Sequence, residues 1–482
     1  MSPLVAPLLA NRSNTLAVRA GRTTLTYRDL NDRLAAASEA LRRAGIGPGT
    51  RVAFALPKSL NSLLVLLATL AVGAAYVPLN PSLSPAALAT ILADLRPDLL
   101  IAPPASVADQ THRLPGLLIT SDIGTSPNRL PGRTETVAQP PSLAAILFTS
   151  GSTGAPKGIM LSHANIATFS SWAAAEFDLT AADQVASHAP FHFDLSTFDI
   201  FATFANGACL HLLGDTDAKF PGAVRAFIAG AGITVWYSVP TALMQLDTRG
   251  ALSNLASLRH ILFAGEVFPT PALRRIMSTL PATQFANLFG PTETNVCTFH
   301  RLAAPPASDE EPIPIGRPCP HVDITLDDDG EILAAGPGVM LGYWRQPALT
   351  AASRVDSRPD SYRTGDLAHL RGDGILMFDG RRDQQIKRHG HRIELPAIEA
   401  VLQSHPAIAE AVALAAGDRL VAYIVENTPI PDPDVKKIIA ARLAPSYQPT
   451  DIIRVSSLPR GANGKTDRGA LRQLLADHGV TI

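Results

Sequence analysis

Short apolar runs that end at turn residues alternate with longer helical patterns over about the first 380 residues. This alternation constrains the fold more than any other feature. Residues 51–56, RVAFAL, are typical of a buried strand, and so are the apolar runs in LRPDLLIAP and SLAAILFTS. Between them lie amphipathic stretches such as NDRLAAASEALRRAG, which Gly45 ends. Strands without a polar face, separated by helices, are typical of a sheet covered on both sides. The sequence therefore predicts an α/β fold.

One apolar stretch, residues 63–77 (LLVLLATLAVGAAYV), could be mistaken for a membrane span. A span needs roughly 20 residues, and this stretch is shorter. Gly73 interrupts it and Pro78 follows it. We therefore expect a buried helix, a glycine turn and a short buried strand.

The overall composition excludes some classes of protein. A chain of 482 residues, 46% hydrophobic and 17% charged, can bury a large core and form several domains or subdomains. Its formal net charge of −1 does not favour a nucleic-acid partner. Cys209, Cys297 and Cys319 are too few and too far apart in sequence for a disulfide framework or a metal motif. Without a signal-peptide pattern at the N-terminus, we expect a cytoplasmic protein that does not bind membranes.

The character of the sequence changes near residue 380. The stretch GRRDQQIKRHGHRIEL is rich in basic residues, and a compact α+β pattern of about 100 residues follows it. We place a domain boundary between Gly380 and Asp383.

A loop rich in glycine and hydroxyl groups follows the apolar run that ends at Leu147, and it reads TSGSTGAPKG. Glycines let backbone N–H groups turn toward an anion, and hydroxyls and a lysine add donors. A flexible linker is the plain alternative, but it would not sit between a strand and the apolar GIML. The glycine spacing also differs from the Walker pattern of kinases and ATPases, because Gly158 follows Lys157. The loop therefore predicts a phosphate site made of Thr149, Ser150, Gly151, Ser152, Thr153, Gly154 and Lys157.

With this loop the chain resembles the ANL adenylating enzymes, which include acyl-CoA synthetases, luciferases and the adenylation domains of nonribosomal peptide synthesis. LTYRDLNDRL, LAVGAAYVPLNP, NLFGPTE, GPGVMLGYWRQP, YRTGDL, GRRDQQIKRHGHRIEL and NGKTDR follow in the order of the family. The resemblance covers nearly the whole chain. It implies a large domain of α/β sheets and a distorted barrel (1–380), a hinge (381–383) and a small mobile α+β domain (384–482).

The resemblance also implies a reaction. A carboxylate is joined to the α-phosphate of ATP, pyrophosphate leaves, and a carrier thiol then attacks the acyl-adenylate. Two anions meet in the first step, so cations and Mg²⁺ are required. Glu293 matches the family's magnesium-side glutamate, Thr292 lies beside the phosphates, and Phe289 takes the place of a tyrosine that stacks on adenine. Asp366 matches the carboxylate that binds the ribose hydroxyls, although an aspartate capping a turn is an alternative. The remaining implied nucleotide contacts are Asn287, Gly290 and Arg381.

Lys465, in NGKTDR, matches the catalytic lysine of the family. By itself, a lysine in a Gly/Asn loop is more often a solvated surface residue. The family usually has a threonine where this chain has Gly461. Asp383 matches the hinge residue about which the small domain rotates between the two half-reactions.

Asp194, in PFHFDLSTFDIF, lies where the amino-acid-activating members hold an aspartate for the substrate ammonium group. Its alternative role is the N-cap of a helix, because DLST suits that position. Acyl-CoA synthetases for plain acids lack this charge. The resemblance places the other pocket residues at Leu195, Phe198, Tyr237, Leu262, Ala264, Leu288, Val296 and Cys297.

None of these pocket positions carries a second charge, so the substrate side chain should be small and apolar. The set resembles that of the free-standing L-prolyl ligases, which load proline on a carrier protein. D-alanyl ligases share FDLS and GEV and are the nearest alternative, and a β-amino acid is a third. A difference of one methylene is worth only about 1–3 kcal/mol, so the residues leave these three open. No carrier motif follows the catalytic loop, so we expect the acceptor to be a separate carrier protein with a phosphopantetheine arm.

Overall fold

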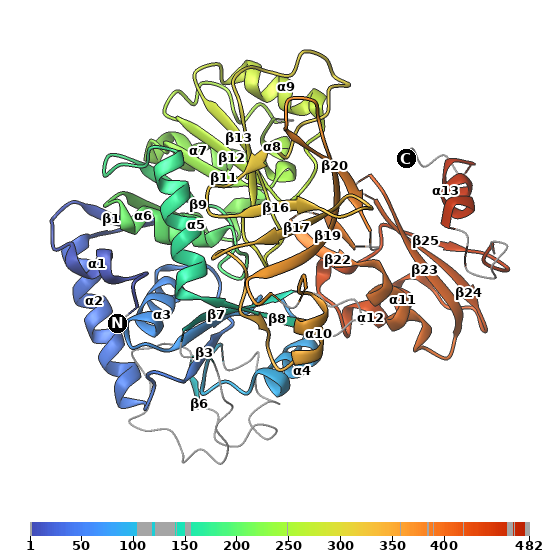
Figure 1. Ribbon diagram of the computed structural model, residues 1–482. Helices are drawn as coiled ribbons and strands as arrows, with labels where there is room; N and C mark the ends of the chain where they lie inside the picture. The colour runs from blue at the N-terminus through green and yellow to red at the C-terminus, as the bar shows by residue number, and fades with distance from the viewer. Residues whose placement is uncertain are drawn as a thin grey trace. The chain divides into compact units, whose positions relative to one another are not determined.

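The computed structural model describes residues 2–103, 118–120, 140, 142–149, 156–247, 249–356, 358–382, 385–388, 390–417, 419–459, 466 and 468–477 (Figure 1). The chain divides into two compact units. Unit 1 comprises residues 1–81, 95–148 and 158–382, and unit 2 comprises residues 82–94, 149–157 and 383–482.

A seven-stranded sheet of mainly parallel strands forms one layer of unit 1, counted over the described residues. Its strands, in spatial order, are β18 (Gly342–Tyr343), β8 (Lys157–Ser162), β7 (Leu143–Thr149), β4 (Ala75–Pro78), β3 (Arg51–Phe54), β5 (Leu99–Ile101) and β6 (Leu118–Thr120). β3 and β4 are buried along their whole length, as the apolar runs predicted.

A nine-stranded sheet, on the same basis, carries most of the predicted pocket residues. Its order is β15 (Arg317–Pro318), β14 (Thr298–Leu302), β13 (Gln284–Phe289), β12 (His260–Ala264), β11 (Val235–Ser238), β9 (Gln184–Ser187), β10 (Cys209–Leu212), β1 (Leu16–Ala20) and β2 (Thr23–Thr26). The strands from β13 to β1 are parallel, whereas β14, β15 and β2 join antiparallel.

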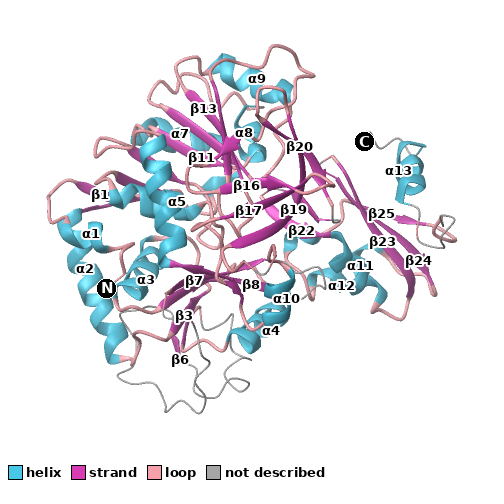
Figure 2. Ribbon diagram, viewed as in Figure 1, coloured by secondary structure: helices cyan, strands magenta, loops and turns pink. Residues whose placement is uncertain are grey.

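A four-stranded antiparallel sheet completes the described sheets of unit 1: β16 (Asp323–Leu326), β17 (Glu331–Ala335), β19 (Ser361–Leu370) and β20 (Leu376–Arg381). The helices of this unit are α1 (Ala6–Ala10), α2 (Tyr27–Arg43), α3 (Leu60–Ala71), α5 (His163–Glu176), α6 (Thr203–Ala205), α7 (Pro221–Ala231), α8 (Pro240–Asp247), α9 (Thr270–Thr279) and α10 (Pro347–Ala352). Shorter turns of helix are the π-helix η3 (Phe198–Ala202) and the 3₁₀ helix η4 (Asp217–Lys219). The predicted α/β class is confirmed (Figure 2).

Two helices show why the sequence folds as predicted. Thr26 caps α2 by accepting from the backbone N–H of Asp29, whose carboxylate accepts the Thr26 N–H in return. Gly45 follows α2 with a φ of +81°, a left-handed conformation that favours glycine. Gly73, also at +81°, turns the chain from α3 into β4. The apolar stretch 63–77 is thus a buried helix, a glycine turn and a strand, as expected.

Apolar faces of helices cover the nine-stranded sheet. One cluster joins Val224 of α7, Leu243 of α8 and Leu273 of α9 to Trp236 and Phe263 of the strands. Figure 2 shows these helices beside the strands that they cover. The opposite face of the same strands packs in a different cluster, which holds the predicted pocket residues.

Unit 2 contains a two-stranded sheet, β21 (Gln385–Arg388) and β22 (His391–Glu394), and a three-stranded sheet, β23 (Ile408–Ala416), β24 (Arg419–Glu426) and β25 (Asp451–Arg454). These counts refer to the part of the chain that the structure describes. Its helices are α11 (Leu395–Gln403), α12 (Asp432–Ala440), the 3₁₀ helix η5 (Pro445–Tyr447) and α13 (Arg468–Asp477), and α4 (Pro85–Leu95) lies almost wholly in it. α11 and α12 cover one face of the larger sheet through Ile398, Leu402 and Val435.

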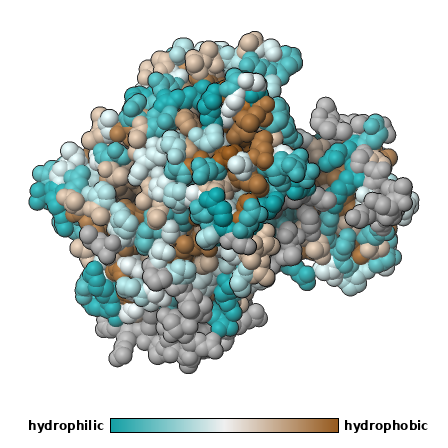
Figure 3. All heavy atoms as spheres, viewed as in Figure 1, coloured by the Kyte–Doolittle hydropathy of each residue, from teal (hydrophilic) through white to brown (hydrophobic). Residues whose placement is uncertain are grey.

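No described helix is both long enough and apolar enough to cross a bilayer. Hydrophilic residues cover much of the face shown in Figure 3, with brown hydrophobic groups between them.

Candidate active site

One face of the nine-stranded sheet brings together four of the predicted pocket residues. Tyr237 of β11 is paired in register with Leu262 of β12, and Ala264 of β12 is paired with Leu288 of β13. Side chains two positions apart in a strand share a face, so Leu262 and Ala264 point the same way. All four are buried in one apolar cluster. The sheet thus forms a flat apolar wall from residues that are distant in sequence.

The other predicted wall residues join the same cluster from outside those strands. Phe198, Val296 and Cys297 are buried, and Leu195 packs against them with partial exposure. Phe198 meets the Tyr237 ring edge-on, with centroids 5.5 Å apart. All eight apolar positions implied by the resemblance therefore lie in one place.

Asp194 lies in the loop between β9 and η3, at the edge of this cluster. Thr197 fixes the loop, because its N–H and its hydroxyl both donate to the Asp194 carbonyl, at 2.9 and 2.6 Å. Burial raises the pKa of the Tyr237 hydroxyl well above its usual range, and the nearby charge of Asp194 raises it further. A carboxylate beside a buried apolar wall favours a ligand with a cationic group.

Glu293 is completely buried in the loop that follows β13. Tyr343 of β18 donates a 2.8 Å hydrogen bond from its hydroxyl to Oε1 of Glu293, and the same hydroxyl lies 3.1 Å from that of Tyr362. The Glu293 carbonyl also accepts the N–H of Met340 at 2.7 Å. Both the backbone and the side chain of Glu293 are therefore fixed.

Asp366 of β19 is buried and is bound by Arg381 of β20, whose Nη1 donates to Oδ1 at 2.6 Å. The two strands are antiparallel, and these two residues are paired in register. Arg381 also donates from Nη2 to the Thr364 carbonyl at 3.1 Å. Two residues that the resemblance assigned separately to the ribose side of ATP thus form one ion pair.

The end of β13 holds the remaining predicted nucleotide contacts of unit 1. The Phe289 ring is partly exposed and lies 5.7 Å from that of Phe378. Asn287 donates from its side chain to the Pro314 carbonyl at 2.8 Å, which ties it to the backbone. A side chain at Gly290 would have its Cβ 1.8 Å from the Asn295 carbonyl oxygen, so only glycine fits. Thr292 is partly exposed between Gly290 and Glu293.

Of the predicted phosphate loop, the structure describes Thr149 and Lys157, both in unit 2. Thr149 ends β7, and its buried hydroxyl meets no hydrogen-bond partner among the described residues. The Lys157 ammonium lies 3.4 Å from Oε1 of the buried Glu394. The other predicted loop residues (Ser150, Gly151, Ser152, Thr153 and Gly154), the predicted hinge residue Asp383 and the predicted catalytic residue Lys465 lie outside the described residues.

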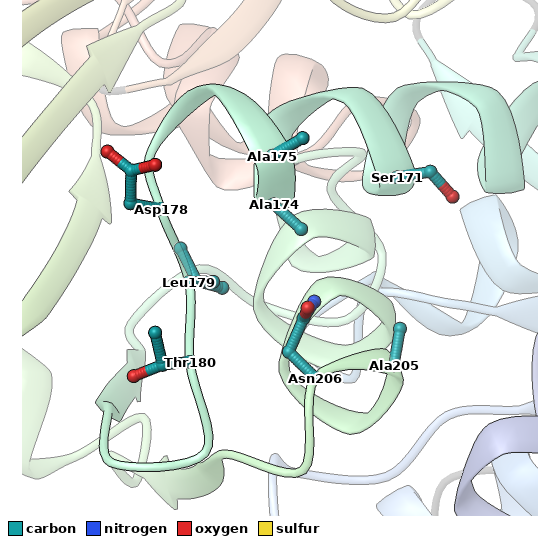
Figure 4. Close-up of a pocket in the computed structure, with 8 residues that line it drawn as sticks. All are labelled: Ser171, Ala174, Ala175, Asp178, Leu179, Thr180, Ala205 and Asn206. Atoms are coloured by element: carbon teal, nitrogen blue, oxygen red, sulfur yellow. The ribbon is translucent and has the colours of Figure 1, made fainter.

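A separate pocket of about 500 Å³ opens on unit 1 (Figure 4). Ser171, Ala174 and Ala175 of α5 line one side, and Thr180 and Asn206 line the other. It includes none of the predicted site residues, so we do not place the reaction there.

Sequence reasoning did not find two residues of the site. Tyr343 lies in the quoted motif GPGVMLGYWRQP, but its partner Glu293 is 50 residues away in sequence. Cys319 is buried in the pocket cluster, and its N–H donates to the Cys297 carbonyl at 2.9 Å. Neither residue belongs to a local pattern that could have revealed its contact.

Comparison with known proteins decides the family. The model of the AMP-binding enzymes matches residues 8–344, and that of the AMP-binding enzyme C-terminal domain matches residues 397–465. The chain belongs to the AMP-binding enzyme family. It is therefore an adenylating enzyme of the ANL superfamily, as the motifs indicated.

Relatives of this AMP-binding enzyme cover it almost end to end. It is 38% identical to an L-proline–[L-prolyl-carrier protein] ligase of Streptomyces coelicolor, over 93% of this chain and 91% of that protein. It is 35% identical to the ligase of the same name from Pseudomonas fluorescens, over 96% and 97%. Among solved structures, the Vibrio cholerae adenylation domain AlmE in complex with glycyl-adenosine-5'-phosphate is 26% identical, with a TM-score of 0.81 over 98% and 97% of the two chains. The amide bond synthetase McbA of Marinactinospora thermotolerans is 25% identical, with a TM-score of 0.86 over 98% and 99%.

Proposed function

We propose that this enzyme activates L-proline with ATP and transfers the prolyl group to a separate carrier protein. In the first step a carboxylate oxygen of proline attacks the α-phosphorus of ATP, and the bond to pyrophosphate breaks. In the second step the phosphopantetheine thiol of the carrier attacks the acyl carbon, and AMP leaves. Family membership makes the enzyme an ATP-dependent, AMP-forming ligase, and its likeness to two prolyl-carrier protein ligases supports the choice of acid and acceptor.

The observation that carries the choice of substrate is the position of Asp194 beside a buried apolar cluster. Proline is a secondary ammonium ion with a compact apolar ring. Its ammonium group suits the Asp194 carboxylate, and its ring suits the wall of Tyr237 and Leu262. Burial of that ring would contribute roughly 0.8 kcal/mol for each CH₂ removed from water.

Asp366 and Arg381 form the proposed ribose side of the nucleotide site. An ionised carboxylate accepts hydrogen bonds from hydroxyl groups strongly. Phe289 offers an aromatic face for adenine. Thr149 and Lys157 supply a hydroxyl and a cation to the proposed phosphate loop.

Magnesium is the metal that the family implies, and Glu293 is the residue that fits it. Mg²⁺ prefers oxygen ligands and is usually held by one or two carboxylates together with water and substrate phosphates. Within the described residues no group of three or more histidine, cysteine or acidic side chains could hold a metal alone. A single buried carboxylate, oriented by Tyr343, suits a metal that arrives with ATP. When bound, the metal would neutralise phosphate charge.

The domain division at 380–383, the hinge role of Asp383 and the catalytic role of Lys465 are parts of the same proposal, and they rest on the motifs that carry them. The cytoplasmic location belongs to the same proposal, and it rests on the few, widely separated cysteines of the sequence.

Exchange of labelled pyrophosphate into ATP tests the proposal. L-proline, D-alanine, L-alanine and a β-amino acid are compared side by side. We expect the highest kcat/KM with L-proline. Exchange with D-alanine and none with L-proline would refute the substrate, and no exchange with any amino acid would refute amino-acid activation. A smaller acid is the second candidate, because the AlmE structure holds a glycyl adenylate.

Asp194→Asn gives a sharper test, because it keeps the size of the side chain and removes its charge. We expect exchange with L-proline to fall sharply while the KM for ATP stays close to that of the wild type. The transfer step is tested separately by mass spectrometry of a carrier protein that bears the phosphopantetheine arm.

A further inference from the structure

Lys58 lies buried in unit 1, in the loop between β3 and α3, and only 7% of it is exposed. Its ammonium nitrogen donates to three consecutive backbone carbonyls at the end of β9: Ser187 at 2.7 Å, His188 at 2.6 Å and Ala189 at 3.2 Å. An ammonium group has three N–H donors, so these bonds use all of them.

Asp199 is the second buried charge at this place. It lies in η3 with no exposed surface. Neither of its oxygens has hydrogen-bond geometry to a described residue. Burial raises the pKa of Asp199 well above its usual range, while the charge of Lys58 and the Ser187 hydroxyl act in the opposite direction.

The charges around Lys58 favour its protonated form. Burial lowers the pKa of Lys58 to about 8, and Asp199 and Asp215 oppose that shift. Asp215 also accepts the backbone N–H of Lys58 at 3.0 Å, which fixes the start of the side chain. The His188 ring lies 4.9 Å from that of Trp236, so the segment after β9 is held by the sheet as well.

Lys58 therefore holds the start of one short segment. Its hydrogen bonds fix residues 187–189, and the buried Asp199 lies ten positions further on. Between these two points lie Asp194 and Phe198. The π-helix at the second point is a rare conformation that is often found at functional sites. Buried polar networks of this kind specify one arrangement of the chain around them.

We propose that Lys58, with the nearby buried Asp199, is a positioning residue for the amino-acid site, because its hydrogen bonds fix the start of the segment that presents Asp194 to the substrate ammonium group. This inference rests on the proposed function. It assigns to Lys58 no contact with the substrate.

The test uses the full-length enzyme in pyrophosphate exchange, with the KM for L-proline and the KM for ATP measured separately. Lys58→Met keeps the chain length and removes the charge and the three donors. We expect the KM for L-proline to rise tenfold to about a hundredfold, the range that a displacement of about 1 Å can produce. The KM for ATP should change much less. Lys219→Met is the matched control, because Lys219 is exposed in the same unit, and it should change neither constant.

Two further variants separate positioning from folding. Lys58→Arg keeps a cation with several donors and should recover part of the affinity for L-proline. In the double variant with Lys58→Met and Asp199→Asn, no buried carboxylate is left without its cation. We expect this double variant to regain melting temperature over Lys58→Met but not affinity for L-proline.

If Lys58→Met does not fold, Asp199→Asn alone serves as the test variant. It should raise the KM for L-proline in the same direction, by a smaller factor. Parallel rises in both KM values, or no change in either for a folded Lys58 or Asp199 variant, would overturn the inference. A wild-type enzyme without amino-acid-dependent exchange would overturn the proposed function instead, and the inference with it.

Discussion

Arg381 and Asp366 form an ion pair of 2.6 Å in which 10% of one side chain and 2% of the other are exposed. Removing one member of such a buried pair leaves a charge without compensation, which costs about 3–5 kcal/mol. We therefore predict that Arg381→Gln lowers the free energy of unfolding by about this amount, as measured by urea denaturation.

Arg363 provides the matched control. It bridges Asp327 and Glu331 on the same sheet, but 40% of its side chain is exposed. Exposed pairs contribute about 0–1 kcal/mol, so Arg363→Gln should be nearly neutral. Equal decreases in the free energy of unfolding of the two variants would show that burial does not set the strength of the Arg381 pair.

Tyr343→Phe removes one hydroxyl, which donates to Glu293 and also lies 3.1 Å from the Tyr362 hydroxyl. If Glu293 binds magnesium, its orientation matters, and loss of such an outer partner lowers metal affinity roughly ten- to a hundredfold. We predict that the magnesium concentration for half-maximal exchange rises accordingly. Tyr423→Phe deletes a buried hydroxyl that donates to Leu471 in unit 2 and should leave this concentration unchanged. An unaltered magnesium requirement in Tyr343→Phe would refute the role of the hydroxyl.

Gly290→Ala tests the tight loop that carries Glu293. The added methyl group would meet backbone atoms, with the Asn295 carbonyl oxygen at 1.8 Å, so the loop must shift. We predict loss of exchange activity and destabilisation of about 1–3 kcal/mol. Gly222→Ala, in α7, adds a methyl group with no atom within 4 Å, and it should stabilise the fold slightly. A fully active Gly290→Ala enzyme would show that the loop tolerates displacement.

The local structure could be predicted from the sequence to a large extent. The helix, glycine turn and strand predicted for the apolar stretch 63–77 are present as α3, Gly73 and β4. This prediction was possible because burial and turn preferences act over a few residues. The order of strands could not be predicted in this way, because Val18 of β1 pairs with Leu210 of β10, 192 residues further along the chain. For the same reason the contacts of Lys58 could not be predicted, since its carbonyl partners begin 129 residues away in the sequence. The motifs predicted the charged residues of the candidate site. The structure was needed to show that Asp366 and Arg381 are in contact.

Buried histidines should make the fold sensitive to acid. Burial lowers the pKa of His188 to about 3, and that of His211 and His260 to about 4, and neighbouring cations (Lys58, Arg19, and Arg259 with Arg301) add to the effect. The unfolded chain takes up these protons near pH 6.5, before the folded chain does. Their contribution to stability is therefore present above that pH and is lost as the pH falls toward 4.

Urea denaturation between pH 7 and 4.5 measures this loss. Each of these histidines adds up to about 1.4 kcal/mol per pH unit to the slope of the free energy of unfolding against pH. His211→Gln should reduce the slope, because it removes one of these buried histidines. Stability that is flat over this range in the wild type would contradict the prediction.

Lys465→Ala tests the catalytic lysine implied by NGKTDR. We predict that adenylation, as measured by pyrophosphate exchange, almost disappears. Transfer of the prolyl group from supplied prolyl-adenylate to the carrier protein should remain largely intact. Equal loss of the two half-reactions would contradict the assigned role.

Unit 2 is assembled from three separate stretches of chain, and this has a consequence for biosynthesis. Residues 82–94 leave the ribosome roughly 290 residues before Asp383, the gap between positions 94 and 383. At about 5–20 residues per second, they wait roughly 15 to 60 s for the rest of their unit. Leu88, Ile91 and Leu92 of α4 are buried in the finished protein. Cutting the gene after Arg382 therefore does not separate the two units, because residues 82–94, which belong to unit 2, stay with unit 1.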